Sequence, residues 1–154
     1  MKSNIMKTFF CLPLVLLFLA AGLLVSLAPE TNTAPVSASL ARDSRCFELR
    51  IYYAAPGKLE ALNVRFRDHT CALFKKHGME IVGFWIPTDQ DQGAENKLVY
   101  MLVHRSREAA KQSWKDFGDD PEWQKARTES EVNGKLTEKV ESVFLSATDY
   151  SPLK

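Results

Sequence analysis

Hydrophobic and polar residues alternate most regularly along residues 46–54, and this alternation predicts a β-strand. One face of the strand is apolar or aromatic throughout and consists of Phe47, Leu49, Ile51 and Tyr53. The opposite face carries more polar side chains, which are Glu48, Arg50 and Tyr52. A proline and a glycine follow this segment, so the strand is expected to end there.

Three further strands are predicted later in the chain. Residues 79–86 form the second strand, which ends at Pro87. Residues 97–104 are apolar on both faces, which is typical of a central strand that is covered on each side. Residues 139–150 form the last strand.

Two helical regions separate these strands. Residues 58–77 place apolar side chains at helical spacing, with a glycine directly afterwards as a C-terminal cap. The second region begins at Ser106, which is a favourable N-cap, and Gly118 is predicted to end its first part. Asp120, followed by proline, then starts a second helical piece.

This order of elements, β-α-β-β-α-β with a broken second helix, predicts an α+β domain of the ferredoxin-like type. Such a sheet has helices on one face only. Because residues 97–104 are apolar on both faces, a second copy is expected to cover the other face, sheet against sheet. The pattern therefore predicts a homodimer that closes as an α+β barrel.

The chain divides into three parts. Residues 1–28 combine two early lysines with a long apolar run, which indicates a signal peptide or a membrane anchor. Residues 29–44 are small, polar and proline-bearing, as in a flexible linker. Residues 45–152 form the domain. The domain is expected to be exported to the periplasm or secreted after cleavage, or alternatively to stay tethered to the membrane by residues 8–28.

Charge gives no indication of a nucleic-acid partner. Removing residues 1–41 removes Lys2, Lys7 and Glu30, so the remainder has 18 basic and 18 acidic residues. A neutral balance does not attract nucleic acid or anionic lipid, so membrane contact is expected only through the N-terminal segment. An oxidising compartment permits a disulfide between Cys46 and Cys71, but their predicted directions diverge, which favours two free thiols.

Three blocks of the sequence resemble the NIPSNAP family, from about Phe47 to Leu153. The blocks are Phe47-Glu-Leu-Arg-x-Tyr52 followed by Pro56-Gly-Lys58, then Trp114-x-x-Phe117-x-x-Asp120-Pro-Glu-Trp123, and finally Glu141-Ser-x-Phe144-Leu-x-x-Thr148-Asp-Tyr-Ser-Pro152. The resemblance implies a dimeric α+β barrel. The family's mitochondrial and vesicle-traffic roles are not implied here, because this chain begins with an export-type leader. Related barrels include monooxygenases, some of which act on haem.

The candidate binding residues lie on the polar face of the first strand, which is predicted to look into the barrel. Arg50 would anchor an anionic or carbonyl group beside Glu48, and aromatic side chains would line an apolar pocket around it. These aromatic residues are Tyr52, Trp85 and Tyr100. The alternative interpretation is an Arg50–Glu48 ion pair that fixes the register of the dimer.

No motif indicates a metal or cofactor site. His69 and His77 are eight residues apart on one helix, too far to share an ion, and His104 is expected at the surface or rim. His77 is the one candidate for haem ligation, although it more plausibly packs against the sheet. Trp114, Phe117 and Trp123 are interpreted as packing residues. The sequence thus predicts a homodimeric domain of unknown activity that binds a small apolar ligand or a protein partner, with a monooxygenase-type enzyme as the alternative.

Overall fold

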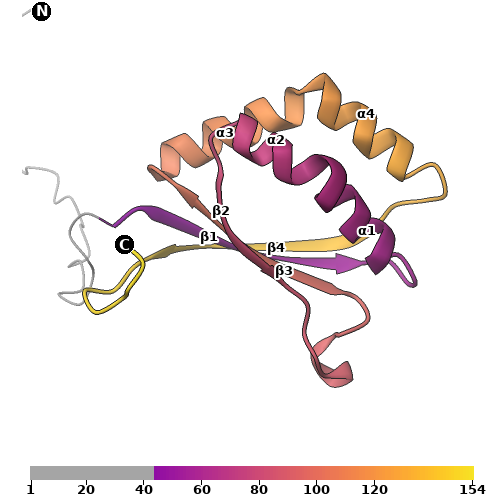
Figure 1. The fold of residues 1–154 in the computed structure, drawn as a ribbon, viewed down its shortest axis with the longest axis horizontal. Helices are drawn as coiled ribbons and strands as arrows, with labels where there is room; N and C mark the ends of the chain where they lie inside the picture. Colours follow the sequence, from indigo (N-terminus) through magenta and orange to yellow (C-terminus); the bar gives the residue numbers. More distant parts are fainter. Residues whose placement is uncertain (1–43) are drawn as a thin grey trace, which may run out of the picture. The chain divides into compact units, whose positions relative to one another are not determined.

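The computed structural model describes residues 44–154, so the predicted leader and almost all of the predicted linker lie outside the described residues. Figure 1 shows the strands as one sheet with the long helices together on one side of it. In chain order the elements are β1 (Cys46–Ala54), α1 (Leu59–Arg65), η1 (Phe66–Thr70), α2 (Cys71–Lys76), β2 (Glu80–Trp85), η2 (Gln90–Gln92), β3 (Lys97–His104), α3 (Arg107–Asp119), α4 (Pro121–Ser130) and β4 (Thr137–Ser146). In residues 44–154 no helix has the length and apolar character needed to cross a bilayer.

The sheet has the strand order β2-β3-β1-β4, and every neighbouring pair is antiparallel. In the centre of the sheet Arg50 lies opposite Tyr100 of β3 on one side and opposite Ser142 of β4 on the other. This order and the β-α-β-β-α-β sequence confirm the predicted ferredoxin-like fold. The prediction that residues 97–104 form an internal strand is also confirmed.

The first helical region was expected to be one helix over residues 58–77, but it has three parts. Five residues in its middle, η1, form a π-helical turn. The side chain of Thr70 stabilises this turn, since its hydroxyl donates to the carbonyl of Arg65 at 3.2 Å. Arg65 at the end of α1 and Phe66 at the start of η1 are both buried.

The second helical region breaks where the sequence predicted, with one difference. Ser106 caps α3, because its hydroxyl accepts a hydrogen bond from the amide of Ala109 at 3.1 Å. Gly118 does not end this helix, which continues to Asp119. The break follows at Asp120, whose carboxylate accepts from the Glu122 amide at 2.8 Å, and Pro121 occupies the first turn of α4.

The main core lies between the sheet and the helices and is rich in aromatic side chains. Tyr100 of β3 and Phe74 of α2 are fully buried in it, with their rings 5.8 Å apart. The predicted packing role of three helical aromatic residues is confirmed, since Phe117 is buried while Trp114 and Trp123 pack against the same core. Burial of such large side chains stabilises the domain by about 2 to 3 kcal/mol each.

The second face of the sheet is free of helices, and we call it the open face. The apolar residues of β1 lie here, against the prediction that placed the polar residues of β1 on this face. In the register of the sheet the apolar residues of the open face are Leu49, Ile51, Val99, Met101, Val143 and Leu145, with Phe47 and Val103 at one end. The same face carries Glu141 opposite Ile51, and Tyr53, Lys97 and Lys139 at its other end. Val143 and Leu145 are exposed.

Candidate functional site

The polar side chains of β1 build a buried cluster on the helix-covered face of the sheet. Glu48 is its centre, with only 1% of the residue exposed. The Oε1 atom of Glu48 accepts hydrogen bonds from Arg50 Nη1 and from the Ser142 hydroxyl, each at 2.7 Å. The Oε2 atom accepts from Trp114 Nε1 at 2.7 Å and lies 2.9 Å from His104 Nε2. One carboxylate thus joins β1, β3, β4 and α3.

The prediction that Glu48, Arg50 and Tyr52 look into a barrel between two copies is therefore wrong, because Trp114 reaches Glu48 from a helix of the same chain. The physical reason is that buried ionic side chains need hydrogen-bond partners, and on β1 the side under α3 provides them. The continuous apolar face is left for the side without helices, while the ionic residues find enough hydrogen-bond partners to be buried under α3. The alternative interpretation, an Arg50–Glu48 ion pair, is present inside one protomer.

Hydrogen bonds keep the Glu48 carboxyl ionised. Burial acts to raise its pKa, but the hydrogen bonds from His104, Ser142, Trp114 and Arg50 outweigh burial and lower it from 4.5 to about 2. Burial likewise opposes the charge of Arg50, but the nearby hydroxyls of Tyr100 and Tyr52 and the Glu48 carboxylate raise the pKa of the guanidinium. A carboxylate with four partners holds the fold together and has little capacity left to accept a substrate proton.

The five candidate binding residues do not form one site. Glu48, Arg50, Tyr52 and Tyr100 lie together, since the Arg50 guanidinium is 5.6 Å from the Tyr52 ring and that ring is 5.4 Å from the Tyr100 ring. Tyr100 is fully buried, and its hydroxyl has no hydrogen-bond partner among the described residues. Trp85 is half exposed at the β2 edge and belongs to a different cavity.

Sequence reasoning missed three members of the cluster, namely His104, Trp114 and Ser142. His104 was expected at the surface or rim, but it is buried. Strand alternation offered a signal for it, because His104 shares its face of β3 with Leu98, Tyr100 and Leu102, all of which are buried. No local signal could have shown that the Trp114 ring stacks on Arg50, with 4.1 Å between the guanidinium and the ring centre.

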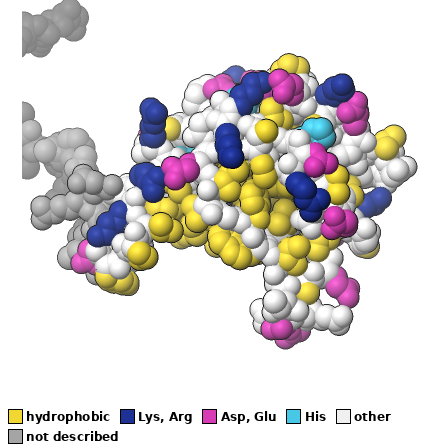
Figure 2. All heavy atoms as spheres, viewed as in Figure 1, with side chains coloured by type: hydrophobic (Ala, Val, Ile, Leu, Met, Phe, Trp, Pro, Cys, Tyr) yellow, Lys and Arg dark blue, Asp and Glu magenta, His cyan; other side chains and the backbone are white. Residues whose placement is uncertain are grey.

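An apolar cavity of about 450 Å³ lies between the first helical region and the β2 edge of the sheet. Its lining residues are Asn63, Phe66, Arg67, Cys71, Phe84, Trp85, Ile86 and Leu98. The Trp85 ring lies along its own strand over Gly83, where an added Cβ would come within 2.9 Å of the ring. Figure 2 shows a band of hydrophobic side chains across the middle of the molecule, below the charged residues of the helices.

A second cavity, which we call the basic cavity, lies between α4 and β4 and has a volume of about 250 Å³. The residues that line it include Tyr52, Arg65, Trp123, Arg127, Glu131 and Thr137. Its chemistry differs from that of the apolar cavity because a buried arginine forms part of its wall.

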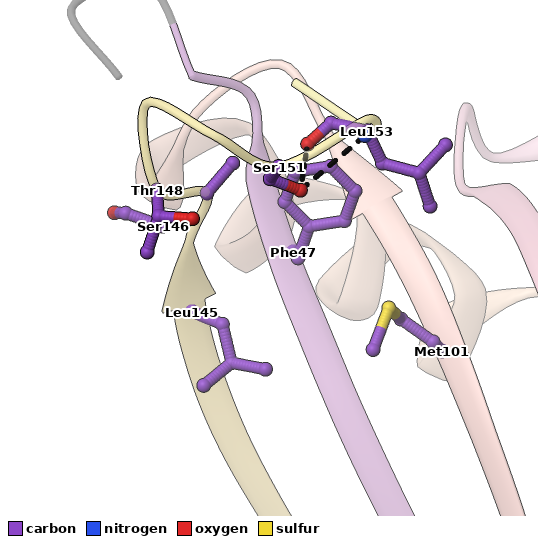
Figure 3. A pocket seen from close by; sticks show the side chains of 8 residues that line it. Phe47, Met101, Leu145, Ser146, Thr148, Ser151 and Leu153 are labelled. Atoms are coloured by element: carbon purple, nitrogen blue, oxygen red, sulfur yellow. Dashed lines mark hydrogen bonds between the residues drawn. The ribbon is translucent and has the colours of Figure 1, made fainter. Parts of the chain in front are cut away.

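A third cavity of about 260 Å³ lies at one end of the open face. Figure 3 shows the C-terminal segment folded across Phe47, with Leu145 and Met101 on the strands beside it. The Ser151 hydroxyl stabilises this turn by donating to the Leu153 carbonyl at 2.8 Å. The chain itself therefore covers the end of the open face but leaves the middle uncovered.

The remaining chemically reactive residues are dispersed. His77 ends α2, and its Nε2 atom lies 2.7 Å from the Asp120 carboxylate, which also pairs with Lys76. This pair ties α2 to the cap of α4 and does not line any of the three cavities. Cys46 and Cys71 are both free, and within residues 44–154 no three metal-binding side chains converge.

Comparison with known proteins places the fold in a group of related domains. The family model NIPSNAP matches residues 47–152, which is more than half of the chain. The structure is similar to that of a NIPSNAP family protein of unknown function from Agrobacterium tumefaciens, with 21% identity, a TM-score of 0.65, and coverage of 75% of this chain and 99% of the other. No protein with a curated description matches the sequence.

Two further solved structures are similar in fold. A second NIPSNAP family protein from Agrobacterium tumefaciens is 24% identical, with a TM-score of 0.61 and coverage of 71% of this chain and 99% of that one. A NIPSNAP-like domain protein from Burkholderia xenovorans is 18% identical, with a TM-score of 0.61 and coverage of 71% and 90%. Similarity at this level of identity concerns the fold and leaves activity to be argued from the site.

Proposed function

Since the chain belongs to the NIPSNAP family, and its similarity to the solved structures establishes the fold alone, we propose from its cavities that it is an exported, homodimeric binding domain for a small apolar molecule. The observation that carries this proposal is the apolar cavity of about 450 Å³ beside β2. Cavities of several hundred cubic ångströms with mostly hydrophobic walls and a few polar groups are typical ligand sites.

The walls of this cavity suit a flat or branched apolar ligand. Phe66, Phe84 and Leu98 provide its inner surface, and these residues also pack in or against the main core, which fixes their positions. The polar side chains of Asn63 and Arg67 lie on the helical side, where they can orient one polar group of a ligand.

The π-helical turn supports the same location. Phe66 and Arg67 belong to η1 and both line the apolar cavity. A single π-helical turn inside an α-helix is rare and is frequently found at functional sites.

The open face supports dimerisation. Its apolar residues Leu49, Ile51, Val99 and Met101 are continuous across the two central strands, and Val143 is exposed on the neighbouring strand. An apolar sheet face of this kind is self-complementary when a second copy turns its own face towards it. Export rests on residues 1–28, and the mass of the mature chain distinguishes cleavage from a retained anchor.

Catalysis is less well supported than binding. Glu48 is the most buried carboxylate, but four donors already occupy its oxygens, and it does not line the apolar cavity. His77 is hydrogen-bonded to Asp120 between α2 and α4 and does not line this cavity. The monooxygenase alternative therefore has no residue in this cavity with the geometry of a general base.

Cavity filling tests the proposal. We expect the neutral fluorescent dye N-phenylnaphthylamine to bind the purified domain, and Cys71→Trp to weaken this binding about tenfold or more by filling the space. The matched control is Ala72→Trp, because Ala72 is the next residue of α2 but is exposed and does not line the cavity. Equal dye binding by both variants would contradict the assignment of this cavity. Competition by phenols and quinols, with oxygen consumption followed in parallel, then separates a binder from an oxygenase.

A further inference from the structure

The buried arginine of the basic cavity has donors that the protein itself does not use. Arg65 on α1 is 4% exposed, yet it is a full positive charge inside the domain. Its hydrogen bonds to other described residues all leave from Nη1, which donates to Glu131 at 2.9 Å and to Ser130 at 3.3 Å. The Nε atom is buried and has no partner within the described part of the chain. At least the Nε donor of the guanidinium is thus left unpaired inside the domain.

Local charge does not neutralise this arginine. Glu131 is the carboxylate closest to Arg65, and it also lies 3.6 Å from the guanidinium of Arg127. Although its partial burial acts to raise the pKa of Glu131, the hydrogen bond from Arg65 lowers it, so the carboxylate is ionised. Two guanidinium groups therefore share the Glu131 carboxylate. The whole lining has four basic residues, Arg65, Arg127, Lys135 and Lys139, against the two acidic residues Glu131 and Glu138, so positive charge is in surplus.

Two further features of the wall match a planar anion. The Trp123 ring lies 5.2 Å from the Arg65 guanidinium, and Tyr52 lies on the sheet side of the cavity. The Thr137 hydroxyl is buried, and among residues 44–154 it too has no hydrogen-bond partner. An unpaired guanidinium donor, an unused hydroxyl and two aromatic rings thus occur around one space of about 250 Å³.

We propose that the basic cavity is a second ligand site, separate from the apolar cavity, which binds a small aromatic or conjugated carboxylate. The two donors of the Nε–Nη2 edge match the two oxygens of a carboxylate, and bidentate pairs of this kind are strong and directional. Thr137 donates to one of the same oxygens, while Trp123 and Tyr52 pack on the planar part of the ligand. The volume limits the ligand to one small ring or a short chain.

Titration calorimetry with benzoate as the probe tests this assignment. We expect benzoate to bind, and the isosteric but neutral benzamide and inorganic phosphate to bind at least about tenfold more weakly. Arg65→Lys should weaken benzoate binding about tenfold, because lysine retains the charge beside Glu131 but lacks the planar pair of donors. The control is Arg105→Lys, since Arg105 is exposed and distant from the cavity lining.

Thr137→Val provides a test that does not depend on the folding of a buried arginine variant. Because the hydroxyl is unused in the free protein, its removal should leave the melting temperature equal or higher while benzoate binding falls several-fold. The proposal is overturned if benzoate does not bind at millimolar concentration, if benzamide or phosphate binds as well as benzoate, or if neither substitution changes its affinity. Unchanged binding of N-phenylnaphthylamine by both variants would show that the two sites are independent, whereas the failure of dye binding alone would refute only the apolar cavity.

Discussion

The two faces of the sheet are built from the same strands, but the ion pair on one face is buried and the ion pair on the other is exposed to water. On the helix-covered face, Glu48 and Arg50 form an ion pair of 2.7 Å in which the glutamate side chain is 1% exposed. At the edge of the open face, Arg45 and Glu80 form a pair of almost equal length, 2.8 Å, with the glutamate side chain 63% exposed. The same chemistry is structural in one place and weak in the other, because burial removes the competition of water.

The apolar side chains also differ in exposure between the two faces. The helix-covered face buries its apolar residues within one protomer, whereas Val143 and Leu145 of the open face remain exposed. Exposed apolar residues, and not the ionic ones, therefore indicate where another molecule is expected on this sheet.

The largest expected effect comes from breaking the buried pair. Glu48→Gln should lower the free energy of unfolding by about 3 to 5 kcal/mol, because Arg50 would remain buried without its counter-charge. Chemical denaturation of the purified domain measures the change. Glu80→Gln is the matched control and should cost less than about 1 kcal/mol. Similar costs for the two substitutions would show that burial does not distinguish the pairs.

The stability that the Glu48 carboxylate provides should depend on pH. The pKa of Glu48 is about 2 in the folded chain against an ordinary value of 4.5. A lowered pKa contributes stability that is fully present above pH 4.5 and is lost as the pH falls towards 2. The contribution is about 3 kcal/mol. Denaturation curves recorded between these pH values should therefore converge for the wild type and Glu48→Gln. A constant difference between the two proteins across this range would contradict the assigned pKa.

A charge on the open face should have a smaller effect, and on assembly instead of folding. Val143→Lys is expected to weaken the proposed dimer by about 2 kcal/mol, because it brings an unpaired charge into an apolar contact. The loss stays moderate, since the lysine stem can bend its charge towards water. Analytical ultracentrifugation over a dilution series measures the dissociation constant. Val132→Lys is the control, since Val132 is highly exposed beyond the end of α4. A wild-type domain that remains monomeric at high micromolar concentration would refute the dimer itself.

Local pattern determined most of the fold. The alternation along residues 46–54, the apolar run at 97–104 and the caps at Ser106 and Asp120 depend on neighbours within a few residues, and the structure has the corresponding strands and helix starts there. The π-helical turn was not predicted, because the apolar side chains of residues 58–77 follow the spacing of a regular helix. Gly118 also failed as a signal, since its helix continues for one more residue before Asp120.

The composition of the candidate sites was less predictable from local pattern than the strands and helices were. Strand alternation by itself separated Glu48, Arg50 and Tyr52 from the apolar residues of β1, and that separation is present in the structure. It could not show which of the two faces the helices cover, since alternation is symmetric between the faces of a sheet. Packing of α3 decided this question by bringing the Trp114 ring onto Arg50 and its indole nitrogen to Glu48. The basic cavity likewise exists only in the folded chain, because its residues Arg65, Trp123 and Thr137 come from three separate elements.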